Sequence, residues 1–272
     1  MQRLKLTVAF EGTAYAGWQI QSGGTRPVPS IQGCLEAAFA RIAGNPVRVH
    51  GAGRTDAGVH ADGQVCHADV DETKMPSDGR KALNACLPPD IRVLSCIPVE
   101  AAFHARKSTV GKRYAYSIWA GRDKPVPRIR NFVAQVPPLD LDPLQAALPH
   151  ITGRHDFASF QNAGAATRNT VRELYSIQCR KGEIACLRCP EDWPVLNIIF
   201  AGNGFLKQMV RNLSGMLIHV GAGKISPVDI PGIMDARDRR ALPSPCAPAR
   251  GLTLLEVMYP ENISSFGAVP QK

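Results

Sequence analysis

The stretch that decides the fold reads Gly51-Ala52-Gly53-Arg54-Thr55-Asp56-Ala57-Gly58-Val59-His60. Glycine reaches left-handed dihedral angles at little steric cost, so the three glycines allow tight, irregular bends here. Apolar and polar residues alternate on both sides of the stretch, with apolar side chains at Val47, Val49, Cys66, Ala68 and Val70. Such alternation is typical of strands with one buried face. We therefore predict a glycine-rich loop that joins two half-buried strands and holds Asp56 still.

The residues around this loop indicate further strands and helices. The chain begins with a strand pattern in which Leu4, Leu6, Val8 and Phe10 share one face. Ser30 can cap a helix that Gly44-Asn45 ends, and a second helix at 78–86 stops at Pro88-Pro89 before a strand at 91–97. The predicted order of strand, helix, strand, strand, helix, strand suits an α+β fold with a mostly antiparallel sheet.

The second half of the chain repeats these patterns. We predict a helix from Asp142 to about His150, strands at 171–179 and 195–201, and a closing strand at 251–259. Between the last two strands, a glycine turn leads into a helix whose apolar stripe begins at Leu206. Residues 180–194, which are rich in cysteine and include Trp193, are interpreted as a variable surface excursion.

Composition narrows the function classes. The 272 residues are 44% hydrophobic, as in a globular protein, and the formal charge of +9 favours a polyanionic partner such as nucleic acid. No apolar run approaches the ~20 residues that span a bilayer, so we expect a soluble protein. No secretory signal pattern precedes the first strand, and the eight cysteines are scattered; we expect reduced thiols in cytoplasm. Zinc at Cys179, Cys186, Cys189 and Cys246 is an alternative to ordinary apolar packing, but it lacks the usual second close ligand pair.

Several segments allow two interpretations from their residues alone. Asp56 is a candidate for chemistry, although an Asp before Ala-Gly is also typical of a plain turn with Arg54 as a surface ion-pair partner. Tyr15 and Trp18 suit either base stacking or packing. Residues 121–138 carry Arg122, Lys124, Arg128 and Arg130 among prolines, and form either a solvated loop or an RNA-contacting arm.

Two further segments bear on catalysis. Lys112, Arg113 and Tyr114 would suit an RNA contact, because a ring stacks on an unstacked base while cations meet phosphate. His155 and Asp156 suggest a catalytic dyad, which we reject because no nucleophile elbow accompanies them and neighbours on an extended chain face opposite ways.

Five separated motifs resemble the TruA family of tRNA pseudouridine synthases. The family's run G-R-T-D-A-G-V-H-A stands unbroken from Gly53 to Ala61, and residues 10–19 resemble its Y-x-G-t-x-Y-x-G-w-Q segment. The strand at 112–116 is similar to its K-R-Y-x-Y motif, and residues 202–212 resemble G-N-G-F-L-x-x-M-V-R-N. The closing strand from Gly251 is similar to G-L-x-L. Gln208 departs from the family, which often has a basic residue there.

The resemblance implies a role for each candidate site residue. Asp56 would be the catalytic nucleophile, Arg211 would pair with it, and Arg54 would act at the vacated phosphate. Tyr114 would stack on the target uracil, and Leu254, or else Leu252, would pack beside it. RNA contacts would come from Lys112, Arg113, His104 and Arg106.

The resemblance also implies the reaction and the assembly. Uridine at positions 38, 39 and 40 of the tRNA anticodon stem-loop would be isomerised to pseudouridine, without cofactor, metal, redox change or group transfer. The nucleophile attacks either C1′ of the ribose or C6 of the ring, and the sequence leaves that choice open. We expect a cytoplasmic homodimer of the pseudouridine synthase fold, with two similar α+β domains at 1–108 and 109–272 and the active-site cleft between them.

Two other function classes compete with this one. A noncatalytic RNA-binding protein on a similar sheet would carry an RNP aromatic motif, which is absent from the sequence. An aspartate-based phosphotransferase would place a second acidic group close to Asp56 for magnesium, and Asp62 does not fit that spacing.

Overall fold

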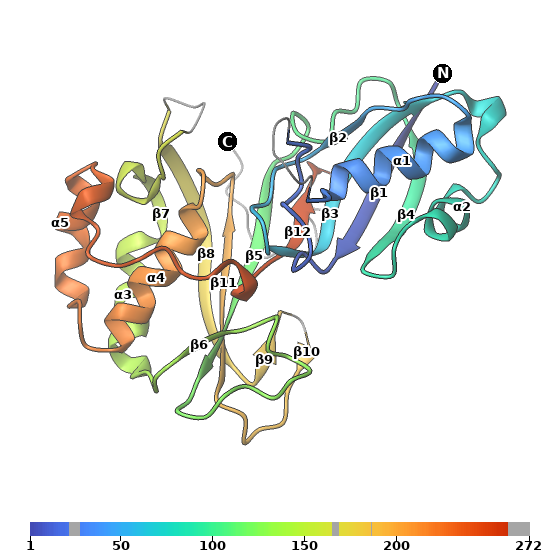
Figure 1. Ribbon diagram of the computed structural model, residues 1–272. Helices are drawn as coiled ribbons and strands as arrows, with labels where there is room; N and C mark the ends of the chain where they lie inside the picture. The colour runs from blue at the N-terminus through green and yellow to red at the C-terminus, as the bar shows by residue number, and fades with distance from the viewer. Residues whose placement is uncertain (22–27, 165–168, 186, 261–272) are drawn as a thin grey trace. The chain divides into compact units, whose positions relative to one another are not determined.

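The computed structural model describes residues 1–21, 28–164, 169–185 and 187–260 (Figure 1). The chain divides into two compact units, the first comprising Met1–Val110 with residues 254–260 and the second comprising Gly111–Thr253. Both units are α+β, with mostly antiparallel strands flanked by helices, as the sequence predicts. Within the described residues, none of the helices has both the length and the apolar character that crossing a bilayer requires.

The first unit is a sheet with helices on one side. Its strands lie in the order β4-β1-β3-β12, with β2 beside β3. The bounds of the strands and helices are β1 Gln2–Phe10, α1 Ile31–Ala43, β2 Val49–Gly51, β3 His60–Val70, α2 Gly79–Cys86, β4 Ile91–Val99 and β12 Leu252–Met258. Strand β1 is antiparallel to both β3 and β4, with Leu6 opposite Cys66 and Cys96. The helices α1 and α2 lie on the same side of these strands (Figure 1).

Sequence signals at the ends of α1 act as predicted. The Ser30 side chain accepts a hydrogen bond from the Gly33 backbone N–H at 3.2 Å, and Gly44 ends the helix in the left-handed conformation at φ 70°. Leu35 and Phe39 are fully buried in the unit's core, to which the sheet contributes Leu6 and Val8. Burial of this stripe, rather than helix propensity, is what stabilises such a helix.

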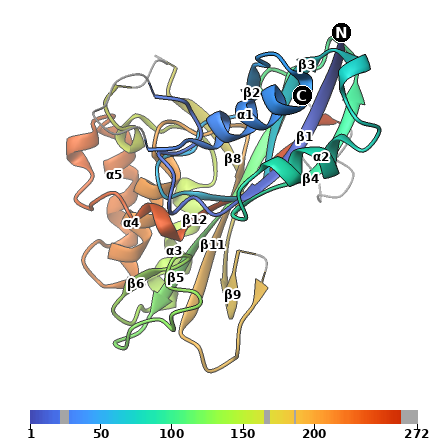
Figure 2. The ribbon, with the colours of Figure 1, turned by 45° about the vertical axis from the view of Figure 1, so that its right-hand side comes forward.

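The second unit has a sheet in the order β5-β11-β8-β7, with the short β6 parallel to β5. Its strands are β5 Gly111–Ala120, β6 Ala134–Val136, β7 Gly153–Asp156, β8 Val171–Lys181, β9 Glu183–Ile184, β10 Leu187–Arg188 and β11 Val195–Gly202. Its α-helices are α3 Leu141–Ile151, α4 Met209–Gly221 and α5 Ile230–Asp235. Helices α3 and α4 pack against each other, and Figure 2 shows α3, α4 and α5 grouped on one side of the unit.

Two details of the second half differ from the sequence interpretation. The helix expected from Leu206 begins at Met209, because Gln208 adopts a left-handed φ of 60° and ends the preceding turn. Leu206 is nevertheless buried in that turn. The interpretation also placed all of 109–272 in one domain, whereas residues 254–260 group with the first unit. The Tyr259 hydroxyl, for example, donates to the Ala105 carbonyl oxygen at 2.7 Å.

Candidate active site

Asp56 lies in the loop between the antiparallel neighbours β2 and β3. Hydrogen bonds tie the start of this loop to β3: the Ala52 N–H donates to the Val65 oxygen at 2.7 Å, and the Gln64 side-chain amide donates to the Gly53 oxygen at 3.1 Å. A turn follows Asp56, with the Val59 N–H donating to the Asp56 backbone oxygen at 3.2 Å. The loop is therefore held by the sheet, and Asp56 is half-buried on it.

The neighbours of Asp56 in the loop face different surroundings. Arg54 is exposed, so its guanidinium is available to a ligand in solution. Thr55 is buried, and among the described residues its hydroxyl has no hydrogen-bond partner. Sequence reasoning missed Thr55, because a threonine between two charged residues carries no signal of burial.

A second glycine-rich loop, residues 11–20, packs against the backbone of the Asp56 loop. The Trp18 backbone N–H donates to the Thr55 carbonyl oxygen at 3.1 Å, and Gly17 has a φ of 96°. A Cβ atom on Gly17 would stand 2.4 Å from the Thr55 oxygen and 2.9 Å from the Asp56 carbonyl carbon. Only a residue without a side chain fits there. We call the contact of Gly17 and Trp18 with Thr55 the glycine brace.

The aromatic residues of the bracing loop pack within the first unit. Trp18 is 2% exposed, and its indole lies where a Cβ on Gly51 would be 2.6 Å away. Tyr15 is also buried, and its hydroxyl donates to Asp90 Oδ1 at 2.5 Å. Of the two interpretations that the sequence left open, packing on the domain is the one the structure favours for both rings.

Tyr114 lies near the start of β5 in the second unit. Its ring is 8% exposed and meets the Phe205 ring edge to face, with centroids 5.2 Å apart. Phe200 stands opposite it on β11. Lys112 and Arg113, on the same strand, are half-buried. The strand and the aromatic contacts thus fix the direction of the Tyr114 ring.

Arg211 lies in the first turn of α4 and is half-buried. Its Nε donates to the Ala247 carbonyl oxygen at 2.8 Å, while the Ala247 N–H donates back to the Arg211 backbone oxygen at 3.2 Å. The proline-rich loop sits close to this helix, because a Cβ on Gly215 would be 2.2 Å from the Pro245 oxygen. Arg211 therefore has one guanidinium nitrogen occupied by the loop, which orients the planar group.

The predicted site residues that remain are Leu254, Leu252, Arg106 and His104. Leu254 is fully buried in β12 within the first unit, and Leu252 is buried at the start of that strand. Arg106 is exposed. The His104 ring accepts hydrogen bonds from the backbone N–H groups of Arg106 and Lys107 at Nδ1, at 3.1 and 3.3 Å.

His104 also belongs to a cluster of three histidines in the first unit. Its ring centroid is 4.7 Å from that of His67, which lies 5.0 Å from that of His50. Burial and the neighbouring His104, Arg3 and His50 together lower the pKa of His67 to about 4. Burial likewise lowers the pKa of His104, and the two backbone donors at Nδ1 suit its neutral ring. His104 thus shapes a turn, and the RNA contact assigned to it stays a prediction.

The structure describes no group of three or more His, Cys, Asp or Glu residues that could hold a metal ion within residues 1–21, 28–164, 169–185 and 187–260. Cys34, Cys66, Cys86, Cys96, Cys179, Cys189 and Cys246 are free thiols. Cys186, a member of the alternative zinc set, lies outside the described residues. His155 and Asp156 form no catalytic dyad, since His155 Nε2 faces the Thr152 oxygen at 2.9 Å and Asp156 accepts from the Ala158 N–H.

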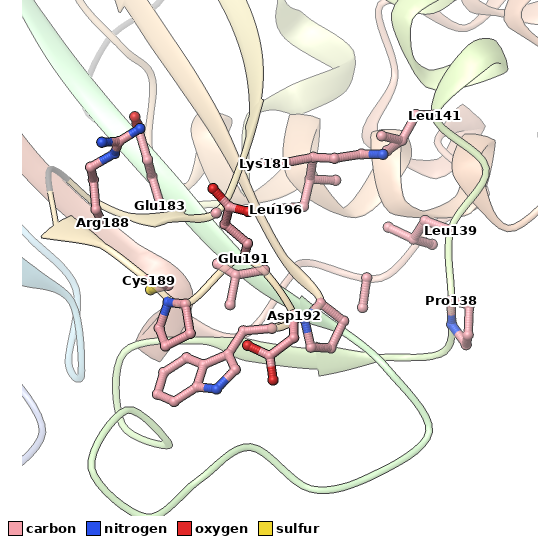
Figure 3. A pocket seen from close by; sticks show the side chains of 16 residues that line it. Pro138, Leu139, Leu141, Lys181, Glu183, Arg188, Cys189, Glu191, Asp192 and Leu196 are labelled. Atoms are coloured by element: carbon pink, nitrogen blue, oxygen red, sulfur yellow. The ribbon is translucent and has the colours of Figure 1, made fainter.

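A cavity of about 790 Å³ lies in the second unit beside β9 and β10 (Figure 3). Its charged walls are Lys181, Glu183, Arg188, Glu191 and Asp192. None of the site residues predicted from the sequence lines it. This cavity is therefore separate from the candidate catalytic residues.

Comparisons with known proteins identify the family. A family model described as tRNA pseudouridine synthase matches residues 6–106 and 147–260, which include Asp56, Arg211 and Leu254 but not the strand with Tyr114. A protein named tRNA pseudouridine synthase A from Oleidesulfovibrio alaskensis is 48% identical, covering 96% of this chain and 98% of that protein. Proteins of the same name from Nitratidesulfovibrio vulgaris and Lawsonia intracellularis are 44% and 45% identical, over 96% and 95% of this chain and 97% and 100% of their own lengths.

Among solved structures, a chain of a Cbf5-Nop10-Gar1 complex matches with a TM-score of 0.31 and 12% identity, over 79% of this chain and 54% of that chain. So low a similarity adds nothing to the assignment. The family model covers most of the chain and the relatives cover nearly all of it. The chain therefore belongs to the tRNA pseudouridine synthase family, TruA, which the unbroken run from Gly53 to Ala61 indicated.

Proposed function

We propose that this protein isomerises uridine to pseudouridine at positions 38, 39 and 40 in the anticodon stem-loop of tRNA, with Asp56 as the nucleophile. The observation that carries the proposal is the family's nine-residue run, intact in a loop that β3 and the glycine brace hold in place. The relatives' shared name supports the substrate class. The basic composition, with a formal charge of +9, supports a polyanionic substrate.

The reaction is an internal rearrangement. The bond between N1 of uracil and C1′ of ribose breaks, the detached ring turns, and a bond forms between C5 and C1′. C5 loses its proton and N1 gains one, so nothing is oxidised and no group is transferred to another molecule. The Asp56 carboxylate attacks C1′ or C6 to make a covalent intermediate, a step for which carboxylates are suited.

Other residues are assigned to support that carboxylate and the base. Arg211 holds the Asp56 carboxylate ionised and oriented, as an opposite charge within a few ångströms does. Its backbone and Nε contacts with Ala247 support this role, because they fix the plane of the guanidinium that would meet a carboxylate. Tyr114 stacks on the everted uracil and Leu254 packs beside it, while Arg54 takes the place of the departed nucleotide at the phosphate.

The remaining assignments concern binding, assembly and location. Lys112, Arg113, His104 and Arg106 contact the RNA, mostly through its phosphates, so binding weakens steeply as salt rises. The protein acts as a homodimer in the cytoplasm and needs no cofactor. Sedimentation of the purified protein tests the dimer, since a monomer at working concentration would remove it from the proposal.

The decisive test compares Asp56→Asn with the unmodified protein and with Asp192→Asn, an exposed control that likewise replaces an Asp carboxylate. Release of tritium from C5-labelled uridine in tRNA measures turnover, and filter binding measures affinity. We expect Asp56→Asn to bind tRNA like the parent and release no tritium, while Asp192→Asn matches the parent in both. Turnover by Asp56→Asn would remove Asp56 from the mechanism.

A second measurement fixes the position of modification. Mapping pseudouridine in tRNA treated with the unmodified protein is expected to find it at positions 38, 39 and 40. Binding of tRNA without any pseudouridine would favour the noncatalytic RNA-binding alternative. Pseudouridine elsewhere in the tRNA would keep the chemistry and overturn the anticodon assignment.

A further inference from the structure

The loop between β5 and β6 carries four cations that the proposed reaction does not use. Arg122, Lys124, Arg128 and Arg130 are all exposed. Within the part of the chain that the structure describes, their side chains make no hydrogen bond or ion pair. We call residues 121–133 the basic loop. It lies outside the two segments that the family model matches.

The basic loop is anchored and does not depend on its charged residues for its position. The Trp119 indole N–H and the Gln135 side-chain amide both donate to the Asp123 carbonyl oxygen, at 2.8 and 3.1 Å. Val133 is fully buried in a small core with Trp119, Ile184 and Val195, and Ile129 and Phe132 pack against it. Because the loop is already ordered, its cations lose less conformational entropy when they bind a ligand.

The anchoring also decides which side chains face solvent. Ile129 packs on the small core and its N–H donates to the Val126 oxygen at 3.1 Å, while Arg128 and Arg130 on either side of it are exposed. The structure thus uses the apolar residue as an anchor and presents the two arginines outward. The basic loop follows the C-terminal end of β5, and its residues Ile129, Phe132 and Val133 pack in the same small core as Ile184 of β9.

The charges of the neighbouring cavity indicate which surface attracts an anion. Glu183, Glu191 and Asp192 outnumber Lys181 and Arg188 on its walls, as Figure 3 shows. The four cations of the basic loop do not line this cavity. A polyanion is therefore attracted to the basic loop and not to the cavity.

The spacing along β5 relates the basic loop to the proposed position of the target base. Tyr114 and Ala120 lie six residues apart on one strand, which at about 3.3 Å per residue is about 20 Å. An A-form RNA duplex rises by somewhat less than about 3 Å per base pair, so it covers that distance in roughly six to eight steps. The basic loop is therefore too far from Tyr114 to touch the everted nucleotide, and it would meet a duplex that continues from that nucleotide along β5.

We propose that the basic loop is a second RNA-binding surface, which grips the phosphate backbone of the substrate roughly six to eight base pairs from the nucleotide being modified. This inference rests on the proposed function, because the assignment of Tyr114 to the target base sets the distance. Because the contact is made to phosphates, it does not depend on the base sequence of the RNA. It lengthens the part of the RNA that the protein recognises.

The test uses RNA hairpins with the same loop and target uridine and with stems that grow from about four to about twelve base pairs. The variant replaces Arg122, Lys124, Arg128 and Arg130 by Gln. On short stems we expect parental Kd and parental turnover. On stems beyond roughly six to eight base pairs we expect Kd to rise at least about tenfold with kcat unchanged. The dependence of log Kd on log[salt] should become shallower by about 0.9 for each phosphate that the variant no longer neutralises.

A matched control removes the same total charge elsewhere. Lys74, Arg80, Lys81 and Arg92 are exposed in the first unit, and their replacement by Gln also lowers the formal charge of +9 by four. We expect this control to affect short and long stems equally. Parental Kd for the loop variant on every stem, or an equal loss of affinity on short and long stems, would overturn the proposal.

The design separates this inference from the proposed function. Pseudouridine formation by the unmodified protein on the shortest hairpin that it accepts tests the reaction. The change in Kd with stem length is measured by binding alone and needs no turnover. An RNA-binding protein without activity would therefore still reveal whether the basic loop contacts the stem.

Discussion

Replacing Gly17 by Ala perturbs the Asp56 loop without touching Asp56. The new Cβ would stand 2.4 Å from the Thr55 carbonyl oxygen, whereas real Cβ atoms essentially never approach other atoms within 3.0 Å and ordinary contact begins at 3.4 Å. The oxygen must therefore retreat by roughly 0.6 to 1 Å, and it is bonded to the carbon that precedes Asp56 in the chain. The Trp18 backbone N–H, which donates to this oxygen at 3.1 Å, is displaced with it.

The expected magnitude follows from two separate effects. An alanine in the left-handed region loses about 1–2 kcal/mol of stability relative to glycine, wherever it lies. A misplacement of about 1 Å at a catalytic group lowers the rate by about 100-fold. We therefore expect Gly17→Ala to have kcat reduced by about 100-fold and an unchanged Kd for tRNA, because the residue contacts the loop backbone and is itself buried.

Gly44 is the matched control for this prediction. It has a similar φ of 70°, and a Cβ there would meet nothing within 4 Å. Gly44→Ala thus carries the backbone strain without the contact to Thr55. Urea unfolding measures the stability of both variants, and tritium release in single-turnover conditions measures the chemical step. A kcat for Gly17→Ala within about threefold of that for Gly44→Ala would show that the glycine brace does not position Asp56.

Three further outcomes are expected. Arg211→Lys keeps the positive charge but loses the planar guanidinium and the hydrogen bond from Nε to the Ala247 oxygen. Single-turnover rates should therefore fall by about 100-fold with little change in tRNA affinity. Parental rates would exclude an orienting role for Arg211. Ser30→Ala removes the N-cap of α1 and should lower the free energy of unfolding by about 1 kcal/mol in urea, with activity per folded molecule unchanged. The pKa of His67 is lowered to about 4 in the folded protein against about 6.5 when unfolded, so the unfolded state binds more protons. Stability should therefore fall as pH drops from 6.5 to 4, a dependence that His67→Gln should reduce.

Local signals in the sequence predicted the elements whose ends are set by local chemistry. Ser30 and Gly44 bound α1 because a hydroxyl cap and a left-handed glycine act on the backbone beside them. The predicted start of α4 is wrong by three residues for the complementary reason. A Gln has no strong preference for a left-handed φ, and nothing in the run from Leu206 to Met209 reveals that Gln208 adopts one.

Contacts between distant residues explain what the sequence left open. The family motif pointed to Asp56, but the brace that holds its loop joins residues 17 and 55, and no periodicity relates two loops. Tyr15 and Trp18 were ambiguous because an aromatic side chain on a glycine-broken loop suits packing and stacking equally. Burial of Trp18 at 2% depends on Gly51, which a single sequence does not place beside it.

The membership of β12 in the first unit has a consequence for how the protein is made. Strand β12, which lies next to β3 in that unit, comes after the whole of the second unit in the chain, so the part of the β3 edge that β2 does not cover stays unpaired while the ribosome translates the second unit. Domains that are contiguous in sequence complete themselves one after the other during synthesis. Here the sheet of the nascent first unit is complete only once β12 has been made, and a chain that ends before Leu254 lacks the strand beside β3, to which the Asp56 loop is hydrogen-bonded.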